Sequence, residues 1–341
     1  MNNSGKNLYN PYFSHIYIEN DVKTHPKTRE ILSQFPDARH IFINHYKDIF
    51  NRGHQNYSLQ KVTPNLILAQ KKQPYLYEGA PVCQDFGNQH FYYSSSVMNC
   101  YYDCEYCYLQ GMYPSANLVI FVNLEDIFNE VENLLKSYPV YLCISYDTDL
   151  LALEHILGYV KVWHKFVSSH PDLTIELRTK SANYHALNNL EPLNNFIIAW
   201  TLTPDTIQKN YEHHTPALDE RLKCIMKAIT KGFSVRLCFD PMIYQKHWKF
   251  LYEDMINTVF SVISADKIKD ISLGVFRVSH EYMKQMRKQR PDSVIIQYPY
   301  ENDNGVFHYG KQVSQEMISY TYNLIKGFIP EKNIYVWKET Q

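Results

Sequence analysis

Three cysteines stand close together in the chain with the spacing C-x3-C-x2-C, at Cys100, Cys104 and Cys107. Thiolates at this spacing can ligate three irons of a [4Fe–4S] cube from a single loop and leave the fourth iron without a protein ligand. Such an open iron can chelate the amino and carboxylate groups of S-adenosylmethionine (SAM) and pass one electron to its sulfonium. The product is a 5′-deoxyadenosyl radical, the kind of chemistry that proteins leave to cofactors. The spacing therefore predicts a [4Fe–4S] cluster with bound SAM.

The same cysteines have two other interpretations. A structural zinc site needs a fourth ligand and usually has two paired C-x2-C arms. His90 is the nearest candidate for that ligand, but its spacing is not a standard one. The cysteines could also be core residues. The spacing, the aromatic residue directly before Cys107 and the position after an expected strand favour the cluster.

Composition and charge limit the class of protein. The 341 residues include 45% hydrophobic and 20% charged residues, which is typical of a folded globular chain. The formal net charge of −1 argues against a histone-like nucleic-acid binder and leaves a local basic groove open. We expect no membrane span, because no apolar run approaches the required length, and no signal peptide. We therefore expect a cytoplasmic protein with reduced thiols.

Short β-branched or aromatic runs alternate with longer amphipathic runs, as in βα units with a parallel sheet. We expect helices to begin near Leu124, Leu150, Ala182, Pro216 and Trp248. Six strands are expected at residues 91–95, 140–145, 173–179, 196–202, 234–240 and 271–276. Six strands with crossover helices predict an α/β fold, an open partial (β/α)6 barrel.

The ends of the chain differ from this pattern. Residues 1–85 read as an N-terminal α/β extension, with strands expected at 15–19 and 66–70. Residues 86–292 form the expected barrel, and 293–341 form a C-terminal extension with a hairpin at 300–309, a helix near 313–326 and a strand at 334–337. The sequence Asn302-Asp303-Asn304-Gly305 supplies the turn of that hairpin.

The sequence resembles the spore photoproduct lyase family of the radical SAM superfamily over roughly residues 90–330. The segment from Cys104 to Gln110 matches most closely, with a Tyr on each side of Cys107 followed by Leu-Gln. Further motifs follow in family order: D-L-L-A-L-E-H from Asp149, R-T-K from Arg178, Y-E-H-H-T-P from Tyr211, D-P-M-I-Y from Asp240, and Gly310-Lys311. The resemblance implies a radical SAM lyase that reverses the thymine dimer 5-thyminyl-5,6-dihydrothymine in DNA, with flavodoxin or ferredoxin as the usual electron donor.

The resemblance also implies roles for single residues. Cys100, Cys104 and Cys107 would hold the cluster, and Thr148, Lys180 and Thr201 would contact SAM. Tyr106 and Tyr108 correspond to tyrosines that relay a hydrogen atom. Lys180 could instead be a solvated charge at a strand end, and a tyrosine beside a cluster could simply pack. The mouth of a βα barrel, where such groups converge, favours the ligand role for Lys180.

The first departure from the family concerns the hydrogen donor, because Tyr146 stands where family members have a Cys. Cys143 lies three residues earlier, and positions three apart on a regular strand face opposite sides. Cys143 could therefore replace the family's Cys only with a bulge or a register shift. Either Cys143 is a core residue, or Tyr146 is the donor, or the reaction is a different one. Cys224 and Cys238 are remoter candidates that more naturally pack in the core.

The second departure lies in the C-terminal hairpin, where the family carries basic and aromatic residues that probe damaged DNA. This hairpin has two acids and no Lys or Arg before Lys311. The basic cluster Lys284, Arg287, Lys288 and Arg290 just upstream is either a phosphate contact or a solvated helix face. Phe307, His308 and Tyr309 could stack on a base or fill the hairpin. The alternatives are a family member with another substrate and a non-catalytic iron–sulfur or zinc protein.

Overall fold

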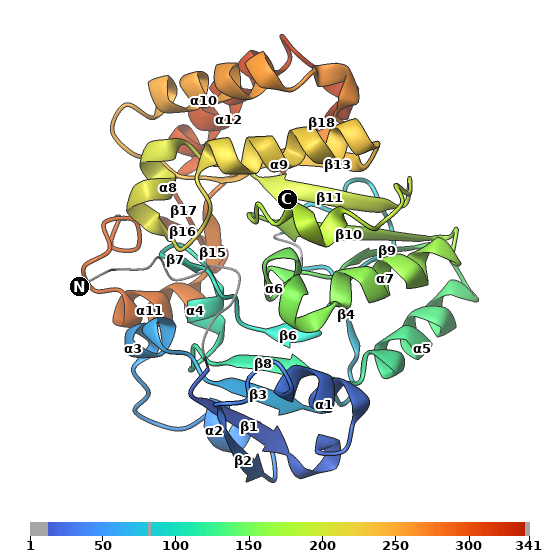
Figure 1. The fold of residues 1–341 in the computed structure, drawn as a ribbon. Helices are drawn as coiled ribbons and strands as arrows, with labels where there is room; N and C mark the ends of the chain where they lie inside the picture. Colours follow the sequence, from blue (N-terminus) through green and yellow to red (C-terminus); the bar gives the residue numbers. More distant parts are fainter. Residues whose placement is uncertain (1–12, 81–82, 338–341) are drawn as a thin grey trace, which may run out of the picture.

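The computed structural model describes residues 13–80 and 83–337. Most of the N-terminal segment on which the expectation about a signal peptide rests lies outside these residues. Its centre is an eight-stranded sheet that curves without closing (Figure 1). From one edge to the other, the strands are β4 (Leu76–Glu78), β5 (Phe91–Ser94), β9 (Val140–Cys143), β10 (Leu173–Thr179), β11 (Phe196–Thr201), β13 (Ser234–Met242), β14 (Asp270–Val275) and β18 (Ile334–Val336). All adjacent pairs are parallel except β4 with β5. The six expected barrel strands are confirmed, in chain order.

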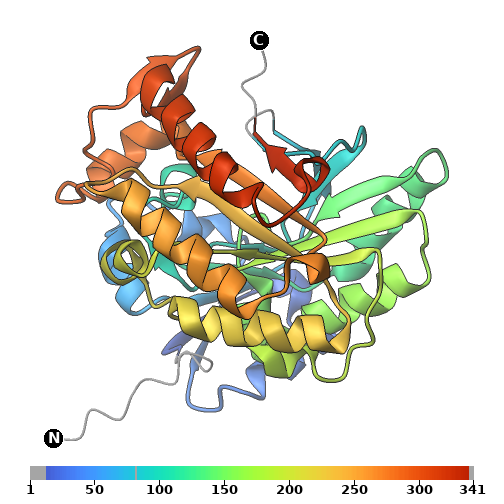
Figure 2. The ribbon, with the colours of Figure 1, turned by 90° about the horizontal axis from the view of Figure 1, so that it is seen from above.

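Every residue of β9, β11 and β14 is buried, as expected for parallel strands that are covered on both faces. The helices that follow the barrel strands or pack beside them are α5 (Leu124–Leu135), α6 (Leu150–Leu157), α7 (Tyr159–Ser168), α8 (Asp205–Tyr211), α9 (Leu218–Lys231), α10 (Trp248–Val262), α11 (His280–Gln289) and α12 (Lys311–Ile325). Helices α9, α10 and α12 lie side by side along the second half of the sheet (Figures 1 and 2).

One helix prediction is wrong. No α-helix begins near Ala182; only a single 3-10 turn, Tyr184–Leu187, links β10 to β11 there. The segment from Ser181 to Asn188 contains no apolar stripe long enough to cover the sheet, and α6 and α7 are the helices in contact with β10. Three further short 3-10 turns are Asn20–Val22, Ala265–Lys267 and Glu331–Asn333.

A second sheet packs below the barrel sheet in the view of Figure 1. Its strands, in spatial order, are β2 (Arg39–Ile43), β1 (His15–Glu19), β3 (Leu66–Ala69), β8 (Leu118–Phe121) and β6 (Val97–Met98). The helices nearest to it in the chain are α1 (Pro26–Leu32), α2 (Lys47–Phe50), α3 (Tyr57–Val62) and α4 (Leu109–Met112). The expected strands at 15–19 and 66–70 are confirmed, but β6 and β8 follow residue 85 in the chain and still complete this sheet.

The two sheets share one hydrophobic core. Leu66 and Leu68 of β3 belong to the same buried cluster as Ile175 and Leu177 of β10. A smaller cluster on the far face of the second sheet joins Phe50 to strands β3 and β8. The second sheet is therefore part of the framework on which the cysteine loop lies.

The C-terminal part contains a three-stranded antiparallel sheet formed by β15 (Arg277–Ser279), β17 (Val306–His308) and β16 (Glu301–Asp303). The expected hairpin is β16 and β17, turned at Asn304 and Gly305, both of which have positive φ. Helix α12 and strand β18 are found as predicted, and β18 adds to the barrel sheet at β14. None of the helices among the described residues is both long and apolar enough to cross a membrane.

Candidate active site

The cysteine loop is held in shape by a short strand pair. β7 (Asp103–Cys104) pairs antiparallel with β12 (Glu212–His213), which places Glu212 opposite Cys104. The Glu105 amide extends the pairing by donating to the Tyr211 carbonyl at 2.8 Å. The family-like motif after β11 therefore folds back onto the cysteine loop.

The start of the loop is anchored from the second sheet. Asn99, in the left-handed conformation, donates from Nδ2 to the carbonyls of Ser115 and Asn117 at 2.7 and 2.8 Å. Lys61, on α3, donates from Nζ to the carbonyls of Cys100 and Tyr102 at 2.6 and 2.8 Å. These contacts fix the backbone on which the three thiols are carried.

The donor set fits a four-iron cluster. Burial raises the pKa of all three thiols, for Cys104 to about 12, while nearby Lys61 and Lys180 act in the opposite direction. A cation beside a thiol favours the thiolate that iron requires. Among the described residues no three His, Cys, Asp or Glu side chains are grouped tightly enough for a single metal ion. A [4Fe–4S] cluster would not need its three cysteine ligands to meet at a single ion, because each thiolate would ligate a different iron.

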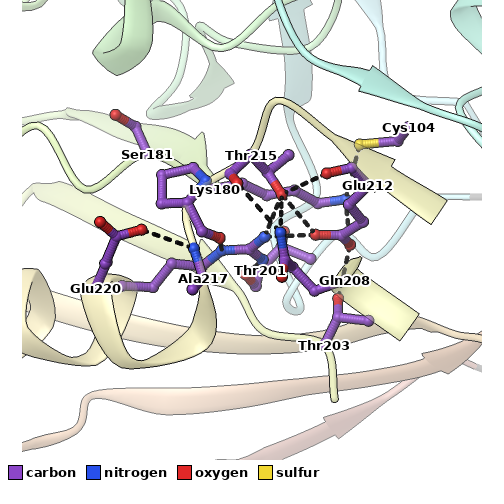
Figure 3. A network of polar contacts seen from close by, with 12 residues as sticks. Cys104, Lys180, Ser181, Thr201, Thr203, Gln208, Glu212, Thr215, Ala217 and Glu220 are labelled. Carbon is purple, nitrogen blue, oxygen red and sulfur yellow. Dashed lines mark hydrogen bonds and ion pairs between the residues drawn. The ribbon is translucent and has the colours of Figure 1, made fainter. Parts of the chain in front are cut away.

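A buried polar network links the cysteine loop to the barrel (Figure 3). The Lys180 Nζ lies 3.5 Å from the Cys104 sulfur, 2.8 Å from the Tyr106 hydroxyl and 2.9 Å from Glu212 Oε1. Glu212 also accepts from the Tyr106 hydroxyl and from Arg221, whose side chain is fully buried. Arg221 donates in addition to the carbonyl of Thr201 at 3.0 Å.

The charges in this network stabilise one another. Burial alone would raise the pKa of Glu212, but the adjacent charges of Arg221 and Lys180 outweigh burial and hold the pKa well below its usual range. Burial likewise acts to lower the pKa of Lys180, and the acidic side chains around it, Cys104 first and then Glu212, raise that pKa well above its usual range. Glu212 is therefore an anion and Lys180 a cation at neutral pH.

The predicted SAM contacts lie at the carboxyl ends of three adjacent strands. Thr148 follows β9, Lys180 follows β10 and Thr201 ends β11. The Thr148 hydroxyl is buried with no hydrogen-bond partner among the described residues, so it is available for a ligand. Asp149 beside it caps α6 by accepting from the Ala152 amide at 3.0 Å, and it also accepts from the Lys180 amide at 2.7 Å.

The four predicted catalytic residues line one cavity of about 240 Å³. Tyr106 and Tyr108 reach it from the cysteine loop, and Cys143 and Tyr146 reach it from the end of β9. The regular-strand rule does not extend to Tyr146, because β9 ends at Cys143 and the strand alternation ends with it, so both residues can line the cavity. The Tyr108 hydroxyl donates to the Tyr146 carbonyl at 2.6 Å, which connects the two segments.

Charged residues of the cavity wall occur as pairs. Arg178 lies 3.0 Å from Glu176, and Arg277 lies 2.8 Å from Asp240. The cavity surface therefore has nearly balanced charge, which suits an uncharged group such as a nucleobase better than a phosphate.

Two of the four basic residues upstream of the hairpin have internal partners. Arg290 pairs with Asp103 of the cysteine loop, and Arg287 donates to the carbonyls of Ile296 and Tyr298. Lys284 and Lys288 are exposed on α11. Among the hairpin aromatics, Tyr309 is buried and accepts from the Tyr244 amide at 3.1 Å.

Three residues of the site were missed by the sequence analysis. Glu212 lies in the Y-E-H-H-T-P motif, but the motif does not indicate that Glu212 pairs with Lys180 and Arg221. Arg221 is on α9 and reads from sequence as a surface charge. Cys83 also lines the cavity. It precedes the expected barrel by several residues, and no spacing relates it to the cysteine cluster. Its residue type is the signal that the sequence offers, because Cys83 is a cysteine outside the C-x3-C-x2-C motif, as are Cys143, Cys224 and Cys238.

The comparisons identify relatives of this chain. A family model described as spore photoproduct lyase matches residues 92–313, which is more than half of the chain. Spore photoproduct lyase of Clostridium acetobutylicum is 24% identical over 192 residues, 54% of this chain and 55% of that protein. Spore photoproduct lyase of Bacillus subtilis is 22% identical over 295 residues, 82% of each chain. The first alignment thus spans about half of the relative, and the second spans about four fifths.

Solved structures agree in fold. A double mutant of spore photoproduct lyase with bound AdoMet and dinucleoside spore photoproduct superposes with a TM-score of 0.76 at 15% identity, covering 97% of this chain and 100% of that one. This supports the partial-barrel architecture. Because the matching family model spans the cysteine loop, the Glu212 motif and the C-terminal hairpin, the chain belongs to the spore photoproduct lyase family of radical SAM proteins.

Proposed function

We propose that this protein is a radical SAM lyase that reverses the thymine dimer 5-thyminyl-5,6-dihydrothymine in DNA. The observation that carries the proposal is the cavity, which brings the two tyrosines of the cysteine loop, Tyr106 and Tyr108, beside Cys143 and Tyr146. Family membership supports the reaction, since the two curated relatives carry the name of this lyase.

The cofactor site of the proposal uses residues at the carboxyl edge of the barrel. Cys100, Cys104 and Cys107 would hold a [4Fe–4S] cluster, and SAM bound there supplies a 5′-deoxyadenosyl radical. Thr148 offers its unpartnered buried hydroxyl to SAM, and Thr201, at the end of β11, lies beside the same mouth.

Lys180 has two tasks in the proposal. It orders the cysteine loop through the Cys104 sulfur and the Tyr106 hydroxyl, and it would also balance the carboxylate of SAM. Arg221 also pairs with Glu212, so Glu212 would keep a cationic partner if Lys180 turned toward the carboxylate of SAM.

The substrate site of the proposal is the cavity and the surface around it. Its volume of about 240 Å³ is smaller than a typical pocket of about 300–1,000 Å³. It would therefore admit a base or part of the dimer rather than a length of duplex, and the lesion must leave the stack to enter. Lys284 and Lys288, exposed on α11, are the candidates for contacts to phosphates outside the cavity.

The second candidate function is radical SAM chemistry on another substrate. Two observations favour it: Tyr146 replaces the family's Cys, and the hairpin carries Glu301 and Asp303. One of these acids, Asp303, lies 3.2 Å from Lys311, which reduces its effect on a nearby phosphate.

The proposal requires partners that supply electrons. A low-potential one-electron donor of the flavodoxin or ferredoxin class would reduce the cluster, and such donors work in a reducing cytoplasm, where we place this protein.

An anaerobic assay tests the radical chemistry. Protein reconstituted with iron and sulfide, then reduced, should convert SAM to 5′-deoxyadenosine and methionine. A protein that holds zinc instead of a cluster after reconstitution and does not cleave SAM would contradict the proposal.

A further inference from the structure

Cys83 and Tyr146 meet in the cavity although they are 63 residues apart in the chain. Cys83 lies in the segment between β4 and β5, and Tyr146 lies in the loop after β9. The Cys83 sulfur is 3.4 Å from the Tyr146 hydroxyl oxygen, within hydrogen-bonding distance. Both residues line the cavity, together with Tyr106 and Tyr108.

The phenol of Tyr146 is held in place from both sides. Its ring stacks on Tyr93 with centroids 4.0 Å apart and an interplanar angle of 23°. The ring of Tyr108 lies on its other flank, with centroids 5.6 Å apart, and the Tyr108 hydroxyl donates to the Tyr146 carbonyl. A ring fixed in this way keeps its hydroxyl directed at the Cys83 sulfur.

The cavity also favours the thiol form of Cys83. Burial raises its pKa above the usual range, and the opposing hydrogen bond to Tyr146 and the nearby arginine charges do not reverse that shift. A donor of a hydrogen atom must carry its S–H bond, which a thiolate lacks. A half-buried thiol with a phenol as its neighbour meets this requirement.

We propose that Cys83 donates the hydrogen atom to the substrate radical and that Tyr146 restores the Cys83 thiol; this inference rests on the proposed lyase function. The S–H bond of Cys83 breaks and a C–H bond forms on the thymine radical, which leaves a thiyl radical. The O–H bond of Tyr146 then breaks and the S–H bond forms again. The resulting phenoxyl radical takes one electron from the flavodoxin- or ferredoxin-class donor and a proton from solvent.

The other cysteines are less suited to this step. Cys143 lines the same cavity, but among the described residues its sulfur has no tyrosine hydroxyl within hydrogen-bonding distance, as Cys83 has in Tyr146. Cys238 is fully buried on β13, and Cys224 is buried on α9, outside the residues that line the cavity. The donor thus enters the site from the segment between β4 and β5 instead of from the end of β9.

The experiment compares wild type with Cys83→Ser, Tyr146→Phe, Cys143→Ser and the control Cys224→Ser in single- and multiple-turnover reactions in D₂O. The substrate is a synthetic dinucleotide spore photoproduct. The wild type should place one deuterium in the repaired thymine, because S–H exchanges with solvent. Cys83→Ser should still form 5′-deoxyadenosine, but its yield of repaired dinucleotide per 5′-deoxyadenosine should fall at least about tenfold, since a serine O–H bond is too strong to donate.

Tyr146→Phe should keep the first turnover and lose the later ones, because Tyr146 restores the thiol and does not touch the substrate. Iron content and thermal unfolding check that each variant is folded and loaded. A second readout needs no turnover: bound dinucleotide should slow alkylation of Cys83, measured by mass spectrometry, and leave Cys224 unaffected.

The possible outcomes distinguish the assignment of Cys83 from the proposed lyase function. Equal repair yields from wild type and Cys83→Ser, or loss of repair in Cys143→Ser alone, would overturn the assignment of Cys83 and leave the lyase function intact. A wild type that forms 5′-deoxyadenosine without repaired dinucleotide would overturn both.

Discussion

The Thr148 hydroxyl is buried at the mouth of the barrel without a partner among the described residues, and this is costly for a polar group. A ligand that forms a hydrogen bond with the hydroxyl would offset this cost in free energy when it binds. Its neighbour Asp149 is fully used by the protein, since it caps α6 and holds the start of the Lys180 segment. Asp149 therefore has a structural role, and the Thr148 hydroxyl is available for the contact to SAM that we propose.

Thr148→Val should weaken SAM binding and leave the fold unharmed. Losing one hydrogen bond of about 0.5–1.5 kcal/mol lowers affinity by about twofold to tenfold. Stability should stay the same or rise, because the variant removes an unsatisfied buried hydroxyl. Calorimetric titration with SAM and thermal unfolding measure the two effects. Thr321→Val, which removes an equally unpartnered hydroxyl on α12, is the control and should leave SAM affinity unchanged.

Cys104→Ala should prevent cluster assembly. The remaining thiols, Cys100 and Cys107, offer two ligands where three irons need one each. Iron and sulfide content after anaerobic reconstitution and the visible absorbance of the cluster measure the loss. Cys224→Ser, a change in a buried thiol outside the cysteine loop, should keep wild-type iron content. A Cys104→Ala protein that still binds four irons and cleaves SAM would refute the ligand assignment.

At the scale of elements, the cysteine loop depends on a buried ion-pair network that includes Lys180, Glu212 and Arg221. Three elements contribute one charge each: the end of β10, the short strand β12 and helix α9. The network joins the loop to the barrel at the point where the Cys104 backbone pairs with Glu212. Removing one member leaves the others buried with unbalanced charge.

Glu212→Gln should destabilise the fold by about 3–5 kcal/mol, because it leaves two buried cations with one fewer anion. The pKa of Glu212 is lowered in the folded state, so its stabilisation is present above the unfolded value of 4.5 and is lost as the pH falls through the folded value. The variant should therefore lose part of the acid dependence of unfolding. Denaturant unfolding at neutral pH and at several pH values below 4.5 measures both effects.

The matched control for that experiment is Glu253→Gln. Glu253 is exposed on α10, where it accepts from the Tyr320 hydroxyl at 2.8 Å. A surface contact of this kind contributes little, so the stability and its acid dependence should stay near wild type. Equal stability of Glu212→Gln and Glu253→Gln would contradict the role given to the network.

The barrel strands could be predicted from the sequence because each is a short apolar run between polar turns. The helix expected near Ala182 is absent, because the residues there have no apolar stripe long enough to cover the sheet. The sequence could not show that Cys143 and Tyr146 line the same cavity, because the alternation of a regular strand ends with β9 at Cys143. Motif spacing identified the cysteine loop, but the ion-pair network and Cys83 depend on contacts between distant segments, which spacing does not encode.

At the scale of the whole molecule, the cavity opens where the barrel sheet, the cysteine loop and the three-stranded C-terminal sheet meet. Val278 and Ser279 of β15 line it, as does Tyr282 of α11. Helix α11 therefore has one end at the cavity and carries Lys284 and Lys288 beyond it. A nucleic acid with a base in the cavity would lie along this helix.

The double variant Lys284→Gln/Lys288→Gln should weaken binding of lesion-containing DNA and make it less sensitive to salt. Each lost phosphate contact lowers the magnitude of the slope of log K against log salt concentration by about 0.9 for duplex DNA. Fluorescence anisotropy over a range of salt concentrations measures that slope. Lys161→Gln/Lys165→Gln, an exposed pair with the same spacing on α7, should keep the wild-type slope. Equal slopes for both double variants would place the phosphate contacts elsewhere.

The measurement that tests the central claim most directly is the anaerobic reaction of reconstituted, reduced protein with SAM and the synthetic dinucleotide spore photoproduct. Undamaged thymine dinucleotide serves as the control substrate. The account predicts that repaired dinucleotide appears together with methionine and 5′-deoxyadenosine, and that all repair is lost without SAM. SAM cleavage with no repaired product, from the dinucleotide and from the same lesion in a longer DNA, would contradict the claim and assign the radical chemistry to another substrate.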